Sequence, residues 1–210
     1  MKPLIAVIGG TGKSGKYLVK QLLHDGYRIK LLLRQPENLQ IDNPLIQPVK
    51  GDARNQEAIL ALLQGCDAVI STLGQPKGET PIFSAATTNV LYAMQAHGIS
   101  RYIVTTGVNV DTSFDTKGTA AKFATEWMKT NYTATTADKQ TEYEILSASG
   151  VDWTLVRLPL IEQTDTRNEV NLSLKDCPGS KISAADLAHF LISQLNDGTY
   201  YKKAPFIANK

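Results

Sequence analysis

Short apolar runs alternate with amphipathic stretches along most of this chain. The runs predict strands at Leu4–Ile8, Ile29–Leu33, Ile46–Lys50, Asp67–Leu73, Arg101–Thr106 and Val151–Leu158. Between them, apolar residues recur at helical spacing, which predicts helices at Lys16–His24, Asn55–Gln64, Phe83–His97, Ala120–Lys129 and Ala137–Ser149. Strands separated by crossover helices are typical of an α/β fold, a doubly wound parallel sheet with helices on both faces.

The last fifty or so residues follow a different pattern. Val170–Leu174 and Phe206–Ala208 are predicted strands, and Ala184–Leu195 is a predicted amphipathic helix. No linker, repeat or low-complexity stretch divides the chain. We therefore expect one domain over residues 1–210, in which residues 159–210 contribute a small cap on the substrate side.

Candidate ligand-binding residues gather where predicted strands end. Ligands of doubly wound sheets bind outside the carboxyl ends of the strands, so these positions predict a single cofactor crevice. The expected cofactor-binding residues are Gly9, Thr11, Gly12, Lys13, Ser14, Gly15, Arg34, Asp52, Ala53, Thr72, Leu73, Gly74, Thr105, Lys139, Leu158 and Pro159.

The glycine-rich segment after the first strand contains two overlapping motifs. Gly9, Gly12 and Gly15 form G-x-x-G-x-x-G, a variant of the dinucleotide fingerprint that brings pyrophosphate onto a helix N-terminus. The letters G-x-x-x-x-G-K, which end at Lys16, form most of a P-loop. That loop needs Ser or Thr next as a Mg²⁺ ligand, and Tyr17 stands there instead. The segment favours a dinucleotide; a P-loop phosphotransferase and a glycine turn without a ligand are the alternatives.

The residue after the second strand bears on which dinucleotide binds. NAD sites usually carry an acidic residue there, whereas this chain has Arg34, whose guanidinium suits the 2′-phosphate of NADP(H). Lys13 would add a second charge. The alternative for Arg34 is a surface arginine that ends a strand. Asp52 would accept from an adenine amino group or cap the helix at Asn55–Gln64, and the two roles are compatible.

Composition excludes several classes of protein. Charged residues make up 20% of the 210 residues and the net charge is +2, which excludes disorder and a strong nucleic-acid-binding field. We find no apolar run of membrane-spanning length and no signal segment, and Cys66 and Cys177 are too few to staple the fold. The three histidines lack metal-ligand spacing. We expect a cytoplasmic protein without metal, nucleic-acid or membrane partners; the pattern specifies no oligomeric state.

Several segments together resemble a known family. They are Gly9–Gly15, Leu33-Arg34, Gly51-Asp52 and Ser149–Arg157. They resemble the atypical short-chain dehydrogenase/reductase group, in its NmrA-like NAD(P)H-binding branch, and are most similar to the biliverdin reductase B/flavin reductase type. The resemblance spans nearly the whole chain. It implies a Rossmann-like fold, an NADP(H) cofactor and reductase activity.

The chain departs from this family where catalytic groups are expected. Ordinary short-chain dehydrogenases use Tyr-x-x-x-Lys, but neither Tyr132 nor Tyr143 has a lysine four residues on. In the biliverdin reductase B type a serine follows the fifth strand and a histidine follows the sixth. By resemblance those positions are Gly107 and Leu160 here, so both polar groups are missing.

Lys139 and Thr106 are the candidate catalytic residues. Lys139 lies eleven residues before Gly150, the spacing at which the related isoflavone and benzylic ether reductases place a catalytic lysine. Its ammonium would polarise a carbonyl or donate a proton; the alternative is a solvated lysine in the helical stretch Asp138–Glu142. Thr106, at the end of the fifth strand, is a weaker candidate for holding the substrate or the nicotinamide amide.

These residues lead to two hypotheses of function. The first is an NADPH-dependent reductase of a conjugated small-molecule acceptor such as a flavin, quinone or tetrapyrrole, which needs little acid catalysis. The second is a non-catalytic NADP(H)-binding redox sensor that acts through a protein partner. The identity of the acceptor depends on the loop Asn109–Thr119 and on the segment after Pro159, where the sequence pattern does not specify shape.

Overall fold

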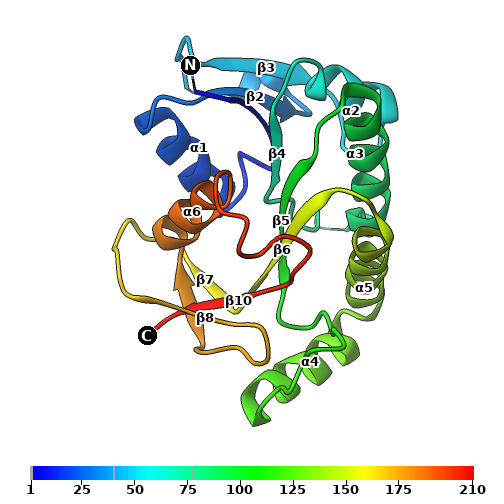
Figure 1. The fold of residues 1–210 in the computed structure, drawn as a ribbon, viewed down its shortest axis with the longest axis vertical. Helices are drawn as coiled ribbons and strands as arrows, with labels where there is room; N and C mark the ends of the chain where they lie inside the picture. Colours follow the sequence, from blue (N-terminus) through cyan, green and yellow to red (C-terminus); the bar gives the residue numbers. More distant parts are fainter. Residues whose placement is uncertain (1, 40, 77) are drawn as a thin grey trace.

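One eight-stranded sheet forms the centre of the molecule (Figure 1). The structure is a computed structural model that describes residues 2–39, 41–76 and 78–210. The strand order is β3-β2-β1-β4-β5-β6-β10-β8, and all neighbours are parallel except β8 and β10. The strands are β1 (Leu4–Ile8), β2 (Arg28–Leu33), β3 (Ile46–Lys50), β4 (Ala68–Ser71), β5 (Arg101–Gly107), β6 (Asp152–Leu158), β8 (Val170–Ser173) and β10 (Phe206–Asn209).

Helices cover both faces of this sheet, as the alternating pattern predicts (Figure 1). One face carries α1 (Gly15–His24) and α6 (Ala184–Ser193), and the other carries α2 (Gln56–Leu63), α3 (Phe83–His97) and α5 (Thr133–Ala148). A 3-10 turn, η1 (Pro36–Asn38), follows β2, and α4 (Thr119–Asn131) lies beyond the lower end of β5 in Figure 1. The Rossmann-like, doubly wound fold class is confirmed.

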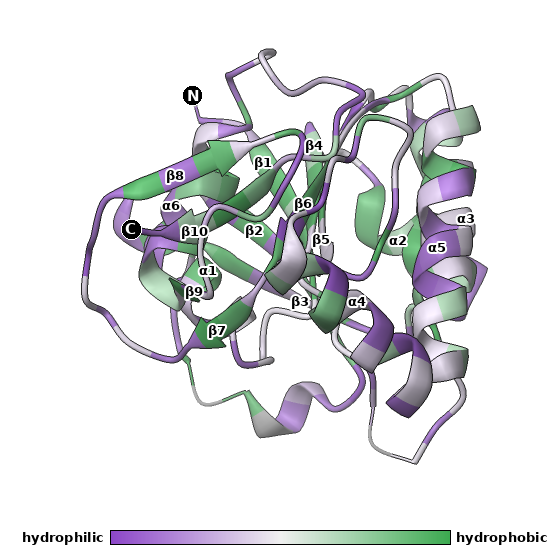
Figure 2. Cartoon of the chain, turned by 90° about the horizontal axis from the view of Figure 1, so that it is seen from below, coloured by the Kyte–Doolittle hydropathy of each residue, from purple (hydrophilic) through white to green (hydrophobic). Residues whose placement is uncertain are grey.

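The apolar strands feed two separate cores because successive side chains point to opposite faces. On β1, Ile5 and Val7 belong to the core under α1 and α6, while Ala6 and Ile8 belong to the core under α2, α3 and α5. Strands buried on both faces must be apolar throughout rather than alternating. Figure 2 shows this as hydrophobic central strands with hydrophilic residues along the outer helices α3 and α5.

The last part of the chain differs from the expected cap. β10 inserts into the central sheet between β6 and β8, and α6 packs against α1. The reason is hydrophobic: Leu187 and Leu191 of α6 are buried in the same core as Leu18 and Leu22 of α1. Leu160 of β7 (Leu160–Glu162) and residues 177–180, which precede β9 (Lys181–Ser183), lie at the carboxyl edge of the sheet, and β7 and β9 pair with each other in parallel.

Two boundaries differ from the prediction in ways that matter for the site. β4 ends at Ser71, so Thr72 and Leu73 lie in the loop after the strand instead of in it. α5 begins at Thr133, four residues before the predicted start at Ala137, and only Tyr132 separates it from α4. Among the described residues, we find no helix that combines the length and the apolar character needed to cross a membrane.

Candidate functional site

Two cavities lie along the edge of the sheet where the parallel strands end. The first, about 290 Å³, is bordered by the ends of β1 to β4. The second, about 840 Å³, is bordered by the ends of β5 and β6, by α4 and by the segment before β9. Of the expected site residues, Gly9, Thr11, Gly12, Arg34, Asp52, Ala53, Leu73 and Gly74 line the first cavity. Lys139, Leu158 and Pro159 line the second.

The glycine loop after β1 fits closely against the end of β4. Gly9 has φ +78°, and a Cβ there would lie 2.7 Å from the carbonyl carbon and oxygen of Thr72. A Cβ on Gly15 would collide with the carbonyl oxygen of Gly9, so the start of α1 also needs a glycine. Among the described residues, no acceptor takes the N–H groups of Lys13, Ser14 and Gly15. The backbone is therefore free to bind a phosphate at the helix N-terminus.

Residues of the overlapping P-loop motif point elsewhere. Lys16 is exposed and its ammonium lies 5.4 Å from the ring centroid of Tyr17. Tyr17 packs, partly buried, against the core under α1 and α6. Neither side chain lines the first cavity. The loop thus lacks the lysine and the hydroxyl that a P-loop directs at its phosphates, and its close glycine packing is what the dinucleotide fingerprint predicts.

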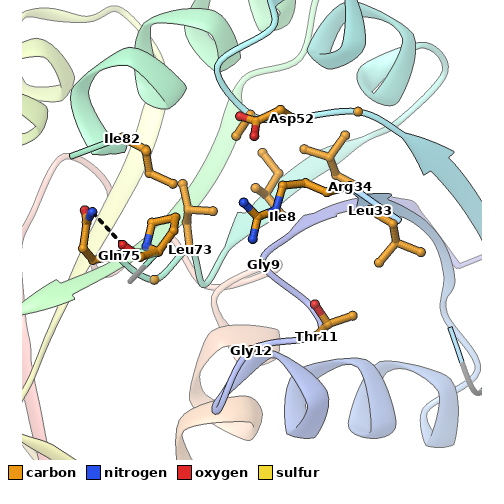
Figure 3. Close-up of a pocket in the computed structure, with 15 residues that line it drawn as sticks. Ile8, Gly9, Thr11, Gly12, Leu33, Arg34, Asp52, Leu73, Gln75 and Ile82 are labelled. Carbon is orange, nitrogen blue, oxygen red and sulfur yellow. Dashed lines mark hydrogen bonds between the residues drawn. The ribbon is translucent and has the colours of Figure 1, made fainter. Parts of the chain in front are cut away.

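Arg34 reaches across the first cavity from the end of β2 (Figure 3). Its Nη1 donates to Oε1 of Glu79 at 3.0 Å, and Nη1 of Arg54 lies 2.8 Å from the other carboxylate oxygen. Hydrogen bonds from Arg54 and then Arg34 lower the pKa of Glu79. Sequence reasoning missed Arg54 and Glu79. Arg54 follows Asp52 by two residues at the end of β3, a signal that was present, but nothing local places Glu79 beside Arg34.

Asp52 lines the first cavity and also shapes the turn after β3. Its carboxylate accepts the backbone N–H of Arg54 at 2.8 Å. The alternative role, capping of α2, is wrong: the cap is Asn55, whose side chain accepts the N–H of Ala58 at 2.9 Å. Asp52 lies too early in the chain to reach the first turn of that helix. Its remaining carboxylate oxygen lies 3.6 Å from Nη1 of Arg54.

Two predicted threonines tie neighbouring strand ends together. The hydroxyl of Thr72 donates to the carbonyl oxygens of Ile8 and Gly9 at 3.4 and 3.3 Å. Thr105 donates to the carbonyl of Ser71 at 3.4 Å. Neither residue lines a cavity. Both hold β1, β4 and β5 in the arrangement that forms the edge of the site.

The second cavity is mostly apolar. Its lining consists of Gly107, Val108, Asn109, Ala120, Ala121, Phe123, Ala124, Trp127, Met128, Lys139, Leu158, Pro159, Leu160, Cys177, Pro178, Gly179 and Ser180. Gly107 and Leu160 are the positions where the resemblance places a serine and a histidine, so those polar groups are missing from the cavity itself. Lys139 is the only charged residue of this lining.

Lys139 lies half-buried at the end of β5, where α5 approaches it. Its Nζ is 4.7 Å from the ring centroid of Phe83 and 3.8 Å from where a Cβ on Gly107 would be. Burial lowers the pKa of Lys139, and the nearby Glu142 partly opposes this. The ammonium therefore faces the cavity and an aromatic ring, which differs from the solvated helix lysine considered as the alternative.

A buried carboxylate lies one helical turn from Lys139. Glu142 is 2% exposed, and its Oε1 accepts from the hydroxyl of Thr87 at 2.8 Å. The Thr87 hydroxyl in turn lies 3.3 Å from the hydroxyl of Tyr102. Its Oε2 has no hydrogen-bond partner among the described residues. Burial raises the pKa of Glu142 to about 7. Sequence reasoning missed this residue because a helical Glu is normally on a solvated face.

Thr106 and Asn109 contribute polar groups close to the same strand end. Thr106 is 4% exposed; its hydroxyl has no partner among the described residues and the side chain lines neither cavity. Asn109, which was not predicted, lines the second cavity, and its Nδ2 donates to Thr136 at 3.2 Å. Its Oδ1 fills the space that a side chain at Gly107 would take.

A buried ion-pair cluster fixes the loop that follows β5. The fully buried Arg157 donates from Nη1 to both carboxylate oxygens of Asp115 at 2.7 Å and stacks on Phe206 at 3.5 Å. Lys117 donates to the carbonyl of Val108 at 2.7 Å. These charges are buried with hydrogen-bonding partners, and through Val108 they support the wall of the second cavity.

Comparison with known proteins connects this geometry to a family. A family model described as NAD(P)H-binding matches residues 9–198. Among curated relatives, subunit 9 of the NADH dehydrogenase (ubiquinone) 1 alpha subcomplex, mitochondrial, of Arabidopsis thaliana is 32% identical over 133 residues, covering 57% of this chain and 33% of that protein. An isoflavone reductase homolog (A622-like) of Nicotiana tabacum is 31% identical over 134 residues, covering 59% and 41%. The chain thus spans well under half the length of these relatives.

Solved structures share the fold at low sequence identity. A short-chain dehydrogenase/reductase of Veillonella parvula, solved in complex with NADP, has a TM-score of 0.81 at 15% identity, covering 100% of this chain and 95% of that one. An oxidoreductase of Lactococcus lactis has a TM-score of 0.78 at 16% identity, covering 99% and 91%. At such identities the likeness concerns the fold alone.

Proposed function

The chain belongs to the NAD(P)H-binding family, and from this premise we propose that it is an NADPH-dependent reductase. The acceptor is a conjugated small molecule, such as a flavin, a quinone or a tetrapyrrole-like compound. The first cavity would hold the adenosine and pyrophosphate parts of the cofactor against the glycine loop. The second would hold the acceptor beside the nicotinamide.

The observation that carries this proposal is the apolar cavity with one lysine. Phe123 and Trp127 offer flat, hydrophobic surfaces, and Lys139 supplies a single positive charge near the end of β5. Aromatic rings stack favourably on flat conjugated molecules. A small polar substrate, which needs several hydrogen-bonding partners, would find few in such a lining.

Lys139 is the proposed proton donor of the reaction. NADPH, when bound, supplies a hydride to the acceptor. The ammonium of Lys139 would then donate a proton to the oxygen or nitrogen that gains negative charge, and a proton from water would restore it. Since burial lowers the pKa of Lys139, proton donation is easier than from a solvated lysine. Conjugated acceptors delocalise the incoming charge, which fits the absence of a Tyr-x-x-x-Lys pair.

NADPH in preference to NADH is the finer part of the proposal. Arg34 lies at the end of β2, where the ribose 2′ group of a dinucleotide is recognised in doubly wound folds. Its guanidinium can form paired, charge-assisted hydrogen bonds to a phosphate. A structural neighbour was solved in complex with NADP, which supports this choice through the fold only.

Two measurements test the proposal in sequence. NADPH and NADH are first titrated against the protein by fluorescence, with ATP and Mg²⁺ as the control for a P-loop phosphotransferase. NADPH oxidation is then followed at 340 nm (the nicotinamide absorbance) with a flavin, a quinone and biliverdin as acceptors. We expect tighter binding of NADPH and turnover with at least one acceptor. Oxidation at the buffer rate with all of them would overturn the reductase.

A second candidate is the non-catalytic redox sensor, and the exposed apolar residues favour it. Phe114, Phe123 and Leu160 are 73%, 72% and 70% exposed, and the last two line the second cavity. Such side chains are also suited to a protein partner. NADPH and NADP⁺ binding with different affinities, but without turnover, would support this candidate over the reductase.

A further inference from the structure

Two arginines from different parts of the fold bind one carboxylate beside the first cavity. Arg34 follows β2 and Arg54 follows β3, while Glu79 lies in the loop between β4 and α3. Each arginine takes one oxygen of Glu79, at 3.0 and 2.8 Å. Arg54 is further held by the carbonyl of Thr80 at 3.4 Å. The three charged side chains are 60%, 33% and 37% exposed for Arg34, Arg54 and Glu79.

This arrangement has the chemistry of a bound phosphate. A phosphate monoester, like a carboxylate, offers adjacent anionic oxygens that guanidinium groups bind by charge-assisted hydrogen bonds. Glu79 places its two oxygens on the donors that a phosphate at the ribose 2′ position would use. The carboxylate is thus a built-in anion at a site for an incoming anion.

The Arg34–Glu79 contact also joins two walls of the first cavity, because Arg34 lines it after β2 and Glu79 belongs to the loop whose Leu73 and Gln75 line it. In Figure 3 the Arg34 side chain extends from the end of β2 toward the loop that carries Leu73 and Gln75. Glu79 belongs to the same loop, 45 residues along the chain from Arg34. Gln75 anchors that loop by donating to the carbonyl of Glu79 at 2.8 Å. A dinucleotide in this cavity would therefore lie close to the ion pair, because Arg34 and the glycine loop line the same cavity.

We propose that Glu79 is a specificity-determining residue that competes with the 2′-phosphate of NADPH for Arg34 and Arg54, and that Arg54 is the second arginine of that phosphate site. The inference rests on the proposed function, because it requires a dinucleotide in the first cavity. A 2′-phosphate displaces the carboxylate from the arginines, whereas NADH, with its uncharged 2′-hydroxyl, leaves the pair intact. Glu79 consequently reduces the preference for NADPH.

The test compares three proteins by calorimetric titration: the wild type, Glu79→Gln, and the control Glu37→Gln. Glu37 is exposed on η1 and makes no ion pair among the described residues. Its replacement by glutamine removes one negative charge three residues from Arg34, as Glu79→Gln removes one beside Arg34. The ligands are NADPH, NADH, 2′-AMP and 5′-AMP. The nucleotide monophosphates report on the phosphate site without the nicotinamide and without turnover.

We expect Glu79→Gln to bind NADPH and 2′-AMP roughly three- to tenfold more tightly than the wild type, the scale of two exposed ion pairs. NADH and 5′-AMP should change by less than about twofold, and Glu37→Gln should match the wild type. In an Arg34→Ala background the Glu79→Gln gain should shrink, because the two residues act as a pair.

Three results would overturn the inference. Weaker NADH binding by Glu79→Gln would show that Glu79 accepts from a ribose hydroxyl. Equal weakening of all ligands would show that Glu79 only holds its loop in place, and an unchanged NADPH-to-NADH ratio would show no competition. If the wild type binds neither dinucleotide, the proposed function itself fails. The three results above would overturn only the inference about Glu79.

Discussion

Asp138 accepts the backbone N–H of Phe83 at 2.7 Å, so a residue of α5 caps the first turn of α3. The same carboxylate accepts from the backbone N–H and the hydroxyl of Ser84. The residue at the N-cap position of α3 is Ile82, which has no side-chain acceptor to offer. Because Asp138 fixes α5 against α3, its neighbour Lys139 is held over the ring of Phe83 and beside the second cavity.

Replacement of Asp138 by alanine should destabilise the fold by about 1–2 kcal/mol, the usual cost of a lost helix cap. Asp138→Asn keeps a side-chain oxygen at the same place and should cost less. Urea unfolding of the wild type and both variants measures the difference. Equal stability of the alanine variant and the wild type would show that solvent satisfies the start of α3 as well as Asp138 does.

Lys139→Met should reduce kcat by up to about a hundredfold, the lower end of what a proton donor contributes, because a conjugated acceptor needs little acid catalysis. NADPH affinity should change little because Lys139 lines the acceptor cavity rather than the first cavity. The matched control is Lys122→Met, an exposed lysine of α4. An unchanged kcat in the Lys139 variant would show that this lysine does not donate the proton.

Trp127→Ala should raise the acceptor KM by about tenfold, because an aromatic contact is worth roughly 1 kcal/mol or slightly more. The residue is 49% exposed, so the free energy of unfolding should change little. Trp127→Phe retains a ring and should retain most of the affinity. Steady-state kinetics with the best acceptor measure these KM values. Equal KM values for all three proteins would show that the acceptor does not bind against Trp127.

Glu142 should make stability fall as pH rises. The folded protein holds this proton up to about pH 7, whereas the ordinary value in an unfolded chain is 4.5, so the folded state binds more protons between these values. The stabilisation is complete below pH 4.5 and is lost as the pH rises through about 7. Urea unfolding of the wild type and Glu142→Gln at pH 5 and pH 8 measures it.

The Glu142→Gln variant should lack this part of the pH dependence, because its amide does not ionise and can still accept from Thr87. Glu144→Gln, on the exposed side of α5, is the control and should follow the wild type. If the wild type and Glu142→Gln lose the same stability between the two pH values, Glu142 is already ionised at pH 5.

Features that depend on a few neighbouring residues could be predicted from the sequence. The glycine loop could be identified from the sequence because it needs glycine: a Cβ at Gly9 or Gly15 would lie too close to neighbouring backbone atoms. The start of α5 could not, because a run of threonines has low helix propensity. There the hydroxyl of Thr133 bonds back to the carbonyl of Lys129 at 2.7 Å and joins α5 to the end of α4.

Contacts between distant segments were beyond prediction. Glu79 meets Arg34 across 45 residues, and Asp138 meets Phe83 across 55. Neither acidic residue differs, in sequence, from a solvated charge. The position of β10 is a similar case: the sequence predicts a strand at Phe206–Ala208, but its place beside β6 depends on packing of the complete sheet.

The place of β10 also determines which strand of the sheet is protected from pairing with other chains. It pairs with β6 and β8, and Phe206 covers the buried guanidinium of Arg157. Until β10 docks, β6 is an unprotected edge with a charged group uncovered, and such edges pair with other chains. We therefore expect β6 to be the segment most prone to pair with other chains in any molecule whose β10 is not docked.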